Sequence, residues 1–208
     1  MSEQPRDWDK RYRDGDMPWD SGLPSRELLR VLDEESIRIG SALELGCGTG
    51  TNAVALAERG FSVTAVDLSP TALAVAKEKA QAAGVVVDWR CDDITAISFR
   101  ETPMDFIFDR GCYHCVRKID LPGFQKAVLS ACREGTQMLL ITGNANAAGS
   151  GGPPRLSADE IRADWAPWFE IEFLREIHLE DAGGVEGPLA WSCLMRRNSQ
   201  SSTWAEDN

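Results

Sequence analysis

Short apolar runs alternate with helix-like segments from residue 41 onward. Runs such as SALEL and FSVTAVDL have the length and the β-branched content of buried strands, whereas TNAVALAERG has helical character and ends at a glycine. We expect strands at residues 41–45, 61–68, 85–91, 104–109 and 137–143, and helices at 51–60, 69–84 and 121–135. This alternation predicts βαβ units in a parallel sheet with helices on both faces.

The two ends of the chain depart from this alternation. Residues 169–180 and 189–197 form two apolar or alternating runs with no helix between them, which predicts a closing antiparallel pair. Before residue 41 we expect two polar turns that carry Trp8 and Trp19, and then a helix over residues 25–36. The Gly-rich stretch GNANAAGSGGPP, residues 143–154, is expected to form an irregular loop. A single domain over residues 1–208 is expected, with an N-terminal piece (1–40), a core (41–197) and a polar tail (198–208).

The composition narrows the classes of partner. The formal net charge of −11 argues against nucleic acid or an anionic membrane surface as the main partner. No apolar run of about 18 residues is present, and the start MSEQPRDWDKRYRDGD is too charged for a signal peptide. The six cysteines lie mostly within apolar segments, so we expect buried thiols in a cytoplasmic protein rather than disulfides.

The stretch ELGCGTG, residues 44–50, contains three glycines in a loop after the first expected strand. A Walker-type phosphate loop requires Lys-Ser or Lys-Thr after its last glycine, but Thr51-Asn52 follows here. The dinucleotide fingerprint requires a glycine at its sixth position, which here is Thr51. Glu44 at the strand end would repel a pyrophosphate, so the loop suits a ligand that presents a cation.

Further carboxylates follow the next two strands. Asp67 ends the second strand, where such folds hold ribose hydroxyls, and Asp92-Asp93-Ile94 follows the third strand, where a carboxylate and a backbone N–H suit adenine. Each aspartate alone would be read as a loop or capping residue. Together, at the ends of consecutive strands, they predict a pocket for an adenosine that bears a positive group.

ELGCGTG, AVDLS and CDDI resemble, in this order and spacing, motifs of the class I S-adenosylmethionine-dependent methyltransferases. The resemblance covers roughly residues 41–143. It implies a Rossmann-like, mostly parallel α/β sheet of seven strands in the order 3-2-1-4-5-7-6, with the last strand antiparallel. It also implies S-adenosyl-L-methionine as the cofactor.

Three further segments are similar to the thiopurine, thiol and halide methyltransferases within that superfamily. WDKRYRDGDMPWDSGLPS, from Trp8, resembles their N-terminal motif, which folds over the cofactor as a lid. DFIFDRG, residues 105–111, resembles the motif of their fourth strand, and GGPPRLSADEI resembles the stretch that follows their substrate loop. The glycine loop has the general methyltransferase form and lacks the Pro-x-Cys-Gly variant of many family members. An ordinary small-molecule methyltransferase with the same lid therefore stays open.

The resemblance also implies roles for individual residues. Trp8 and Trp19 are expected to line the cofactor and its lid, and Arg110 to lie at the boundary of cofactor and substrate. Asp109 is expected either to contact the methionine ammonium or the substrate, or only to pair with Arg110. The remaining expected cofactor contacts are Glu44, Gly46, Gly48, Asp67, Leu68, Asp93 and Ile94.

Few residues of the chain offer acid–base chemistry. The only histidines are His114, close to the expected acceptor and either a base, a hydrogen-bond donor or a structural residue, and His178, expected to be structural. Cys112 and Cys115 lack a second pair, so we expect no metal site and assign both to the core. Trp165, with the aromatic residues that follow it, is expected to pack in the core.

A sulfonium is already an activated methyl donor, so the tasks of the protein are to align the reactants and to exclude water. We therefore expect an enzyme that methylates a small soft nucleophile, namely a thiol, a selenium or tellurium species, or a halide, with Arg110, His114 and Asp109 as candidate catalytic residues. The alternatives are a small-molecule O- or N-methyltransferase and a non-catalytic S-adenosylmethionine-binding protein. A nicotinamide-dependent oxidoreductase is disfavoured by Glu44 and by the glycine spacing. We expect a monomer or a weak homodimer.

Overall fold

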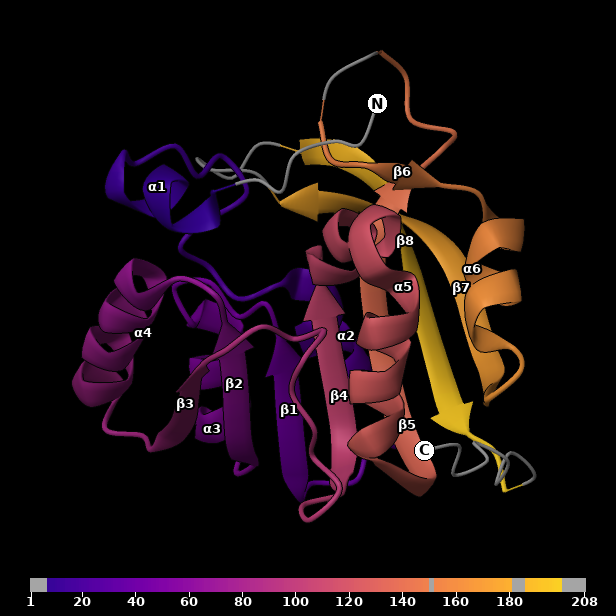
Figure 1. The fold of residues 1–208 in the computed structure, drawn as a ribbon, viewed down its shortest axis with the longest axis horizontal. Coiled ribbons are helices and arrows are strands. Elements are labelled where there is room, and N and C mark those ends of the chain that lie inside the picture. The colour runs from indigo at the N-terminus through magenta and orange to yellow at the C-terminus, as the bar shows by residue number, and fades with distance from the viewer. Residues whose placement is uncertain (1–6, 150–151, 181–185, 200–208) are drawn as a thin grey trace.

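A computed structural model describes residues 7–149, 152–180 and 186–199, and the expected polar tail lies almost entirely outside this range. One mixed sheet forms the centre of the molecule (Figure 1). Its strands follow the order β3-β2-β1-β4-β5-β8-β7, which confirms the expected order because β7 and β8 are the two closing strands. A further two-residue strand, β6 (Arg155–Leu156), pairs with β5 and was not expected.

The five parallel strands of the core lie where the apolar runs predict them, with one difference. They are β1 (Ser41–Leu45), β2 (Ser62–Asp67), β3 (Val87–Cys91), β4 (Met104–Arg110) and β5 (Cys132–Asn144). The expected helix over residues 121–135 is wrong at its end, because residues 132–135 already belong to β5. The chain leaves the helix at Ala131 since Cys132 pairs with Met104 of β4.

The closing strands are β7 (Phe169–Glu180) and β8 (Glu186–Arg197). β8 is antiparallel both to β5 and to β7, as the chain pattern predicts. This arrangement leaves the carboxyl ends of β1 to β5 on one edge of the sheet. In Figure 1 this edge is at the top, and α1 (Trp8–Arg13) lies above its left part, on the side of β2 and β3.

Helices cover both faces of the sheet. Apolar residues of α2 (Arg26–Glu34), α3 (Thr51–Glu58) and α4 (Pro70–Ala83) pack on one face, and those of α5 (Cys112–Ser130) and α6 (Ala158–Trp165) on the other. The capping residues of α4 are as predicted: Ser69 accepts a hydrogen bond from the backbone N–H of Ala72, and Gly84 adopts a left-handed conformation at the other end.

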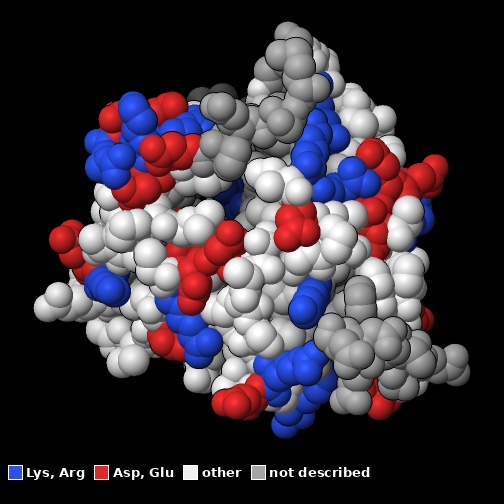
Figure 2. Space-filling view, in the orientation of Figure 1, with Lys and Arg blue, Asp and Glu red and all other residues white. Residues whose placement is uncertain are grey.

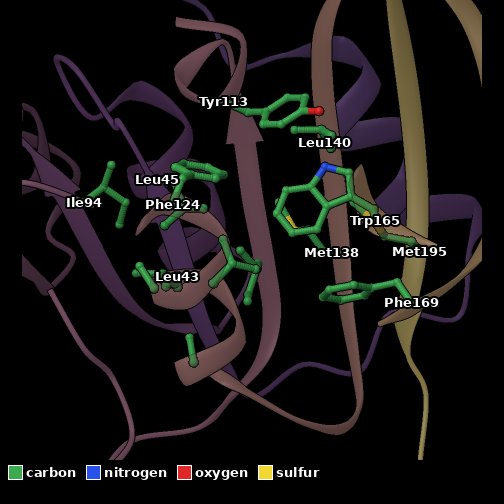
Figure 3. Close-up of a cluster of buried hydrophobic side chains, with 14 of the residues drawn as sticks. Leu43, Leu45, Ile94, Tyr113, Phe124, Met138, Leu140, Trp165, Phe169 and Met195 are labelled. Atoms are coloured by element: carbon green, nitrogen blue, oxygen red, sulfur yellow. The ribbon is translucent and has the colours of Figure 1, made fainter. Parts of the chain in front are cut away.

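The core under α5 and α6 is rich in aromatic residues (Figure 3). Trp165 and Tyr113 are fully buried and lie 5.6 Å apart by ring centroid, which confirms the expected core role of Trp165. The Tyr113 hydroxyl donates to Asp164 of α6, and Arg117 pairs with the same carboxylate. α5 is thus fixed to α6 by both packing and hydrogen bonds, so its first turn is held in place at the edge of the sheet.

The N-terminal segment differs from the two polar turns that we expected. Residues Trp8–Arg13 form the short helix α1, because Asp7 caps it by accepting from the N–H of Lys10 and two ion pairs link residues four apart. The expected helix over residues 25–36 is α2, with Ser25 as its N-cap.

Candidate functional site

A cavity of about 480 Å³ lies at the carboxyl ends of the parallel strands, and α1 contributes to its lining. Most of the residues that the sequence singles out line it. From the sheet side come Gly46, Asp67, Leu68, Asp93 and Ile94. Trp8 and Trp19 come from the lid, Arg110 from the end of β4 and His114 from the start of α5. A smaller hollow with Glu44 and Gly48 in its lining shares Gly46, Trp19 and Arg110 with this cavity.

Glu44 lies at the bottom of this smaller hollow, at 2% exposure. Its Oε1 accepts a 3.3 Å hydrogen bond from the Asn52 side chain, whose own Oδ1 accepts from the backbone N–H of Ser25. Its Oε2 has no hydrogen-bond partner among the described residues. Burial raises the pKa of Glu44 to about 8, since few groups compensate the ionised form. A buried carboxylate oxygen that faces a hollow without a partner suits a cationic ligand group.

Two glycines of the glycine loop approach other parts of the protein closely, and Gly46 lines both the cavity and the smaller hollow. Gly46 and Gly48 both have positive φ, of 62° and 53°. A Cβ on Gly46 would lie 2.7 Å from the Cβ of Cys112, and one on Gly48 would lie 2.7 Å from the Tyr12 hydroxyl. Larger residues are therefore excluded at both positions by strain and by collision. These features, together with Glu44, fit S-adenosylmethionine, whose methionine part carries an ammonium group.

Asp67 connects the glycine loop to the start of α4. Its Oδ2 accepts from the backbone N–H of Gly48 and its Oδ1 from that of Ser69, both at 2.8 Å. Burial raises the pKa of this carboxyl group, and the two N–H donors oppose that effect. The carboxylate is therefore held in one orientation at the cavity wall, with its remaining lone pairs available to ligand hydroxyls.

The residues expected to bind adenine, Asp93 and Ile94, follow β3. Ile94 is 5% exposed and contributes an apolar wall. Asp93 is exposed, and its Oδ1 accepts from both the backbone N–H and the hydroxyl of Thr95. This turn fixes the Asp93 carboxylate, and the exposed side chain of Leu68 lines the same cavity.

Three aromatic side chains of the lid cluster over the cavity. Trp19 makes edge contacts with Trp8 and Tyr12, at ring-centroid distances of 5.6 and 6.0 Å. The Arg11 guanidinium stacks over Trp19 at 4.2 Å from the ring centroid and is paired with Asp16. The outer surface of α1 carries interspersed acidic and basic side chains, which are visible at the upper left of Figure 2.

The lid is tied to the core at three points. Asp9 accepts from the Ser69 hydroxyl at 2.7 Å and from the backbone N–H of Thr71, at the N-terminus of α4. Asp20 accepts from the Thr49 hydroxyl at 2.6 Å, and Arg110 donates to the carbonyl oxygen of Trp19 at 3.2 Å. The last two contacts join the lid to the glycine loop and to the end of β4. Asp9, Asp20 and Thr49 were not predicted from the sequence as residues of the site.

Asp109 does not line the cavity. It is fully buried below the first turn of α5, where its carboxylate accepts from the backbone N–H groups of Gly111 and Tyr113 at 3.0 and 2.9 Å. Burial raises the pKa of Asp109 to about 7, against the effect of these donors. The structure shows no ion pair between Asp109 and Arg110 among the described residues, so their expected pairing is not seen.

His114 lines the cavity from α5 and is 6% exposed. The backbone N–H of Gly143 donates to its Nδ1 at 3.2 Å, and the Thr142 hydroxyl lies 3.2 Å from the same nitrogen. An Nδ1 that accepts from a backbone N–H leaves the proton of the neutral imidazole on Nε2. His178, in contrast, is exposed on β7, its Nδ1 lies 3.1 Å from the Gly187 carbonyl oxygen, and it does not line this cavity.

A family model for "Thiopurine S-methyltransferase (TPMT)" matches residues 3–186 of the chain. The chain belongs to this family. It is therefore an S-adenosylmethionine-dependent methyltransferase with a Rossmann-like fold, as its sequence motifs imply.

Individual relatives of the family differ in their acceptors. The chain is 28% identical to 2-heptyl-1-hydroxyquinolin-4(1H)-one methyltransferase of Mycobacteroides abscessus over 158 residues, which are 74% of this chain and 69% of that protein. It is 38% identical to thiocyanate methyltransferase 1 of Brassica oleracea, but over only 34% of this chain and 31% of that protein. For the second relative, the chain thus matches about a third of the protein.

Solved structures show the same fold. One was solved for the conversion of a disulfide bond into a thioacetal group during echinomycin biosynthesis; it has a TM-score of 0.76 and 27% identity, over 89% of this chain and 86% of that one. A methyltransferase of Anabaena variabilis has a TM-score of 0.71 and 17% identity, over 95% and 99% of the two chains, and supports the fold alone. None of the described helices is long and apolar enough to cross a membrane.

Proposed function

We propose that this methyltransferase acts on a small soft nucleophile, namely a thiol, a selenium or tellurium species, or a halide, which binds between the lid and the first turn of α5. The observation that carries the proposal is that the two candidate bases have their basic atoms engaged with backbone N–H groups. His114 accepts from Gly143 through Nδ1, and Asp109 accepts from Gly111 and Tyr113. Such a site favours acceptors that need no base.

Cofactor binding is assigned to the residues of the cavity floor and of the smaller hollow. Glu44 would hold the ammonium group, Gly46 and Gly48 the methionine part, Asp67 the ribose, and Asp93 with Ile94 the adenine, beside Leu68. Bound S-adenosylmethionine supplies an activated methyl group. The residues of this chain need only position the acceptor and exclude water, because displacement at a sulfonium carbon requires alignment and desolvation.

Trp8 and Trp19 exclude water from above, and the two guanidinium groups at the cavity favour an anionic acceptor. Arg11 and Arg110 both line the cavity. A thiol with a pKa near 8.5 is a few per cent ionised at neutral pH, and a neighbouring cation raises that fraction. His114, with its proton on Nε2, acts as a hydrogen-bond donor to the acceptor rather than as a base.

The relatives support this proposal in part. The names of the thiocyanate methyltransferase and of the probable thiol methyltransferase 2 of Arabidopsis thaliana indicate soft acceptors, and the echinomycin structure concerns the conversion of a disulfide bond. The Mycobacteroides relative names a hydroxyquinolinone instead. A small-molecule O-methyltransferase is therefore the second candidate.

An acceptor panel tests the proposal. Release of S-adenosylhomocysteine is followed with a small thiol, iodide, selenite, a catechol and a hydroxyquinolinone at equal concentration. We expect the highest kcat/KM with the thiol or with iodide. Turnover of the catechol or the hydroxyquinolinone alone would overturn the soft-nucleophile proposal and leave the family assignment intact.

A further inference from the structure

Cys112 and Cys115 occupy the first turn of α5 and both line the cavity. They are three residues apart, so their side chains lie on one face of the helix with Cβ atoms about 5–6 Å apart. Neither cysteine forms a disulfide among the described residues, and both are partly buried. The Cys112 side chain packs directly against the glycine loop, since a Cβ on Gly46 would lie 2.9 Å from its Sγ. Neither thiol has a part in the proposed transfer.

Two uses of such a thiol pair differ in what they require. A disulfide oxidoreductase requires a thiolate with a lowered pKa in positive surroundings. Here burial raises the pKa of Cys112, and the neighbouring Asp109 carboxylate raises it further. The surroundings therefore oppose redox exchange, whereas they do not prevent the capture of an electrophile that forms two strong bonds to sulfur.

The number of ligating side chains near the two thiols determines which electrophile can bind there. Among the described residues there is no group of three or more His, Cys, Asp or Glu side chains that could hold a metal ion, which argues against zinc. A trivalent arsenical with one organic group needs only two thiols, because its own carbon occupies the third position. Val116 and Ile141 also line the cavity and provide apolar surface for that organic group.

We infer that Cys112 and Cys115 form a two-thiol binding site for monosubstituted trivalent arsenicals within the cavity. The binding reaction joins R–As(OH)₂ to the two thiols. Two As–S bonds form and two As–O bonds break, and the thiol protons leave with the hydroxide groups as two molecules of water. Arsenic stays trivalent, so no oxidant or reductant is required. This inference concerns binding and holds whichever methyl acceptor the enzyme uses.

Phenylarsine oxide, which hydrates to the dihydroxy form, is the probe for this site. Intact-mass spectrometry of the cofactor-free protein is expected to show one phenylarsenic group per chain. The adduct should survive excess monothiol and be released by a dithiol, because two bonds to one ligand raise avidity by about 10²-fold or more. Peptide mapping after alkylation should find residues 112 and 115 protected together. An adduct that monothiols remove would overturn the inference.

Cys112→Ser and Cys115→Ser should each weaken binding of the probe by about 10²-fold. Cys91→Ser removes an exposed thiol, and Cys47→Ser removes the thiol in the glycine loop, so both serve as matched controls that retain the adduct. Thermal melts check that each variant is folded. A loss of the dithiol-sensitive adduct in Cys47→Ser, with retention in Cys115→Ser, would also overturn the inference, since the chelating pair would then be a different one.

Discussion

The Asp20 carboxylate in the N-terminal segment accepts a 2.6 Å hydrogen bond from the hydroxyl of Thr49 in the glycine loop. The same hydroxyl accepts from Lys79 of α4, which also donates to Thr51. This chain of contacts runs from the lid through the glycine loop to a helix of the core. The position of the lid and the shape of the proposed cofactor site are therefore coupled.

Replacement of Asp20 should weaken cofactor binding without a large loss of stability. A hydrogen bond to a charged group contributes about 1.5–3 kcal/mol, and in Asp20→Ala we expect S-adenosylhomocysteine to bind roughly 10-fold more weakly. Calorimetric titration measures this change. Asp14→Ala is the control, because Asp14 pairs only with the exposed Lys10 among the described residues. Equal affinity of the Asp20 and Asp14 variants would contradict the coupling.

Glu44 should make stability and cofactor binding respond to pH in opposite directions. Its pKa is about 8 in the folded chain, against an ordinary value near 4.5. Between these values the folded carboxyl group holds a proton that the unfolded one has lost, so the free energy of unfolding falls as pH rises. Binding of an ammonium group requires the ionised carboxylate, so the affinity for S-adenosylhomocysteine should increase over the same interval.

Urea unfolding and calorimetric titration at about pH 5.5 and about pH 8 measure both slopes. Glu44→Gln should abolish the pH dependence of binding. It should reduce the slope of stability without removing it, because Asp109, with a pKa of about 7, contributes in the same direction. Glu176→Gln is the control, since asparagine donors lower the pKa of that exposed carboxyl group. Cofactor affinity that rises with pH in Glu44→Gln as in the parent would show that another group is responsible.

The sequence predicts the sheet and the cavity floor well because both depend on local patterns. Strand-end carboxylates such as Asp67 and glycines such as Gly46 are adjacent in the fold whenever parallel strands end at one edge. The sequence places Cys112 and Cys115 at the start of a helix but predicts a helix only over residues 121–135, because a non-helical Asp120 interrupts α5 between the two parts. Its start is held by a local hydrogen bond from the backbone N–H of Tyr113 to Asp109 and by the tertiary contact of the Tyr113 hydroxyl with Asp164.

The contacts of the lid also could not be predicted from local sequence patterns. Its tryptophans are recognisable in the sequence, but its anchors are ordinary acidic residues in a charged segment. Nothing local distinguishes Asp9 and Asp20, which contact the core, from Asp14 and Asp16, which pair with lid cations. Their roles depend on which core groups lie opposite, and these are at Thr49 and Ser69.

Asp109 should act as a positioning residue for α5. Asp109→Asn removes a buried carboxylate that accepts from two backbone N–H groups, and we expect a loss of about 1–3 kcal/mol in the free energy of unfolding. Turnover should fall by a similar factor for every acceptor, iodide included, because the helix start itself shifts. A general base would give a different result, with normal stability, normal turnover of iodide and a selective loss for protonated acceptors. Parallel urea titrations and acceptor assays distinguish the two.

Trp19 should affect turnover far more than folding. It is half-buried in the lid and packs on Trp8, Tyr12 and Arg11 rather than in either core cluster. In Trp19→Ala we expect kcat/KM to fall by about 10- to 100-fold, since water then reaches the reacting groups, while Tm falls by no more than about 4 °C.

Trp165→Ala should do the reverse of Trp19→Ala and affect folding more than turnover. Trp165 of α6 is fully buried against α5 and β7, so its removal should cost about 3–5 kcal/mol and lower Tm by roughly 6–20 °C. Activity of the protein that remains folded should change less than in Trp19→Ala, because Trp165 does not line the cavity. Thermal melts and initial rates of both variants, measured at a temperature at which each is folded, separate the two roles. A Trp19 variant that loses as much Tm as the Trp165 variant, with normal turnover, would place Trp19 in the structural core instead of the lid.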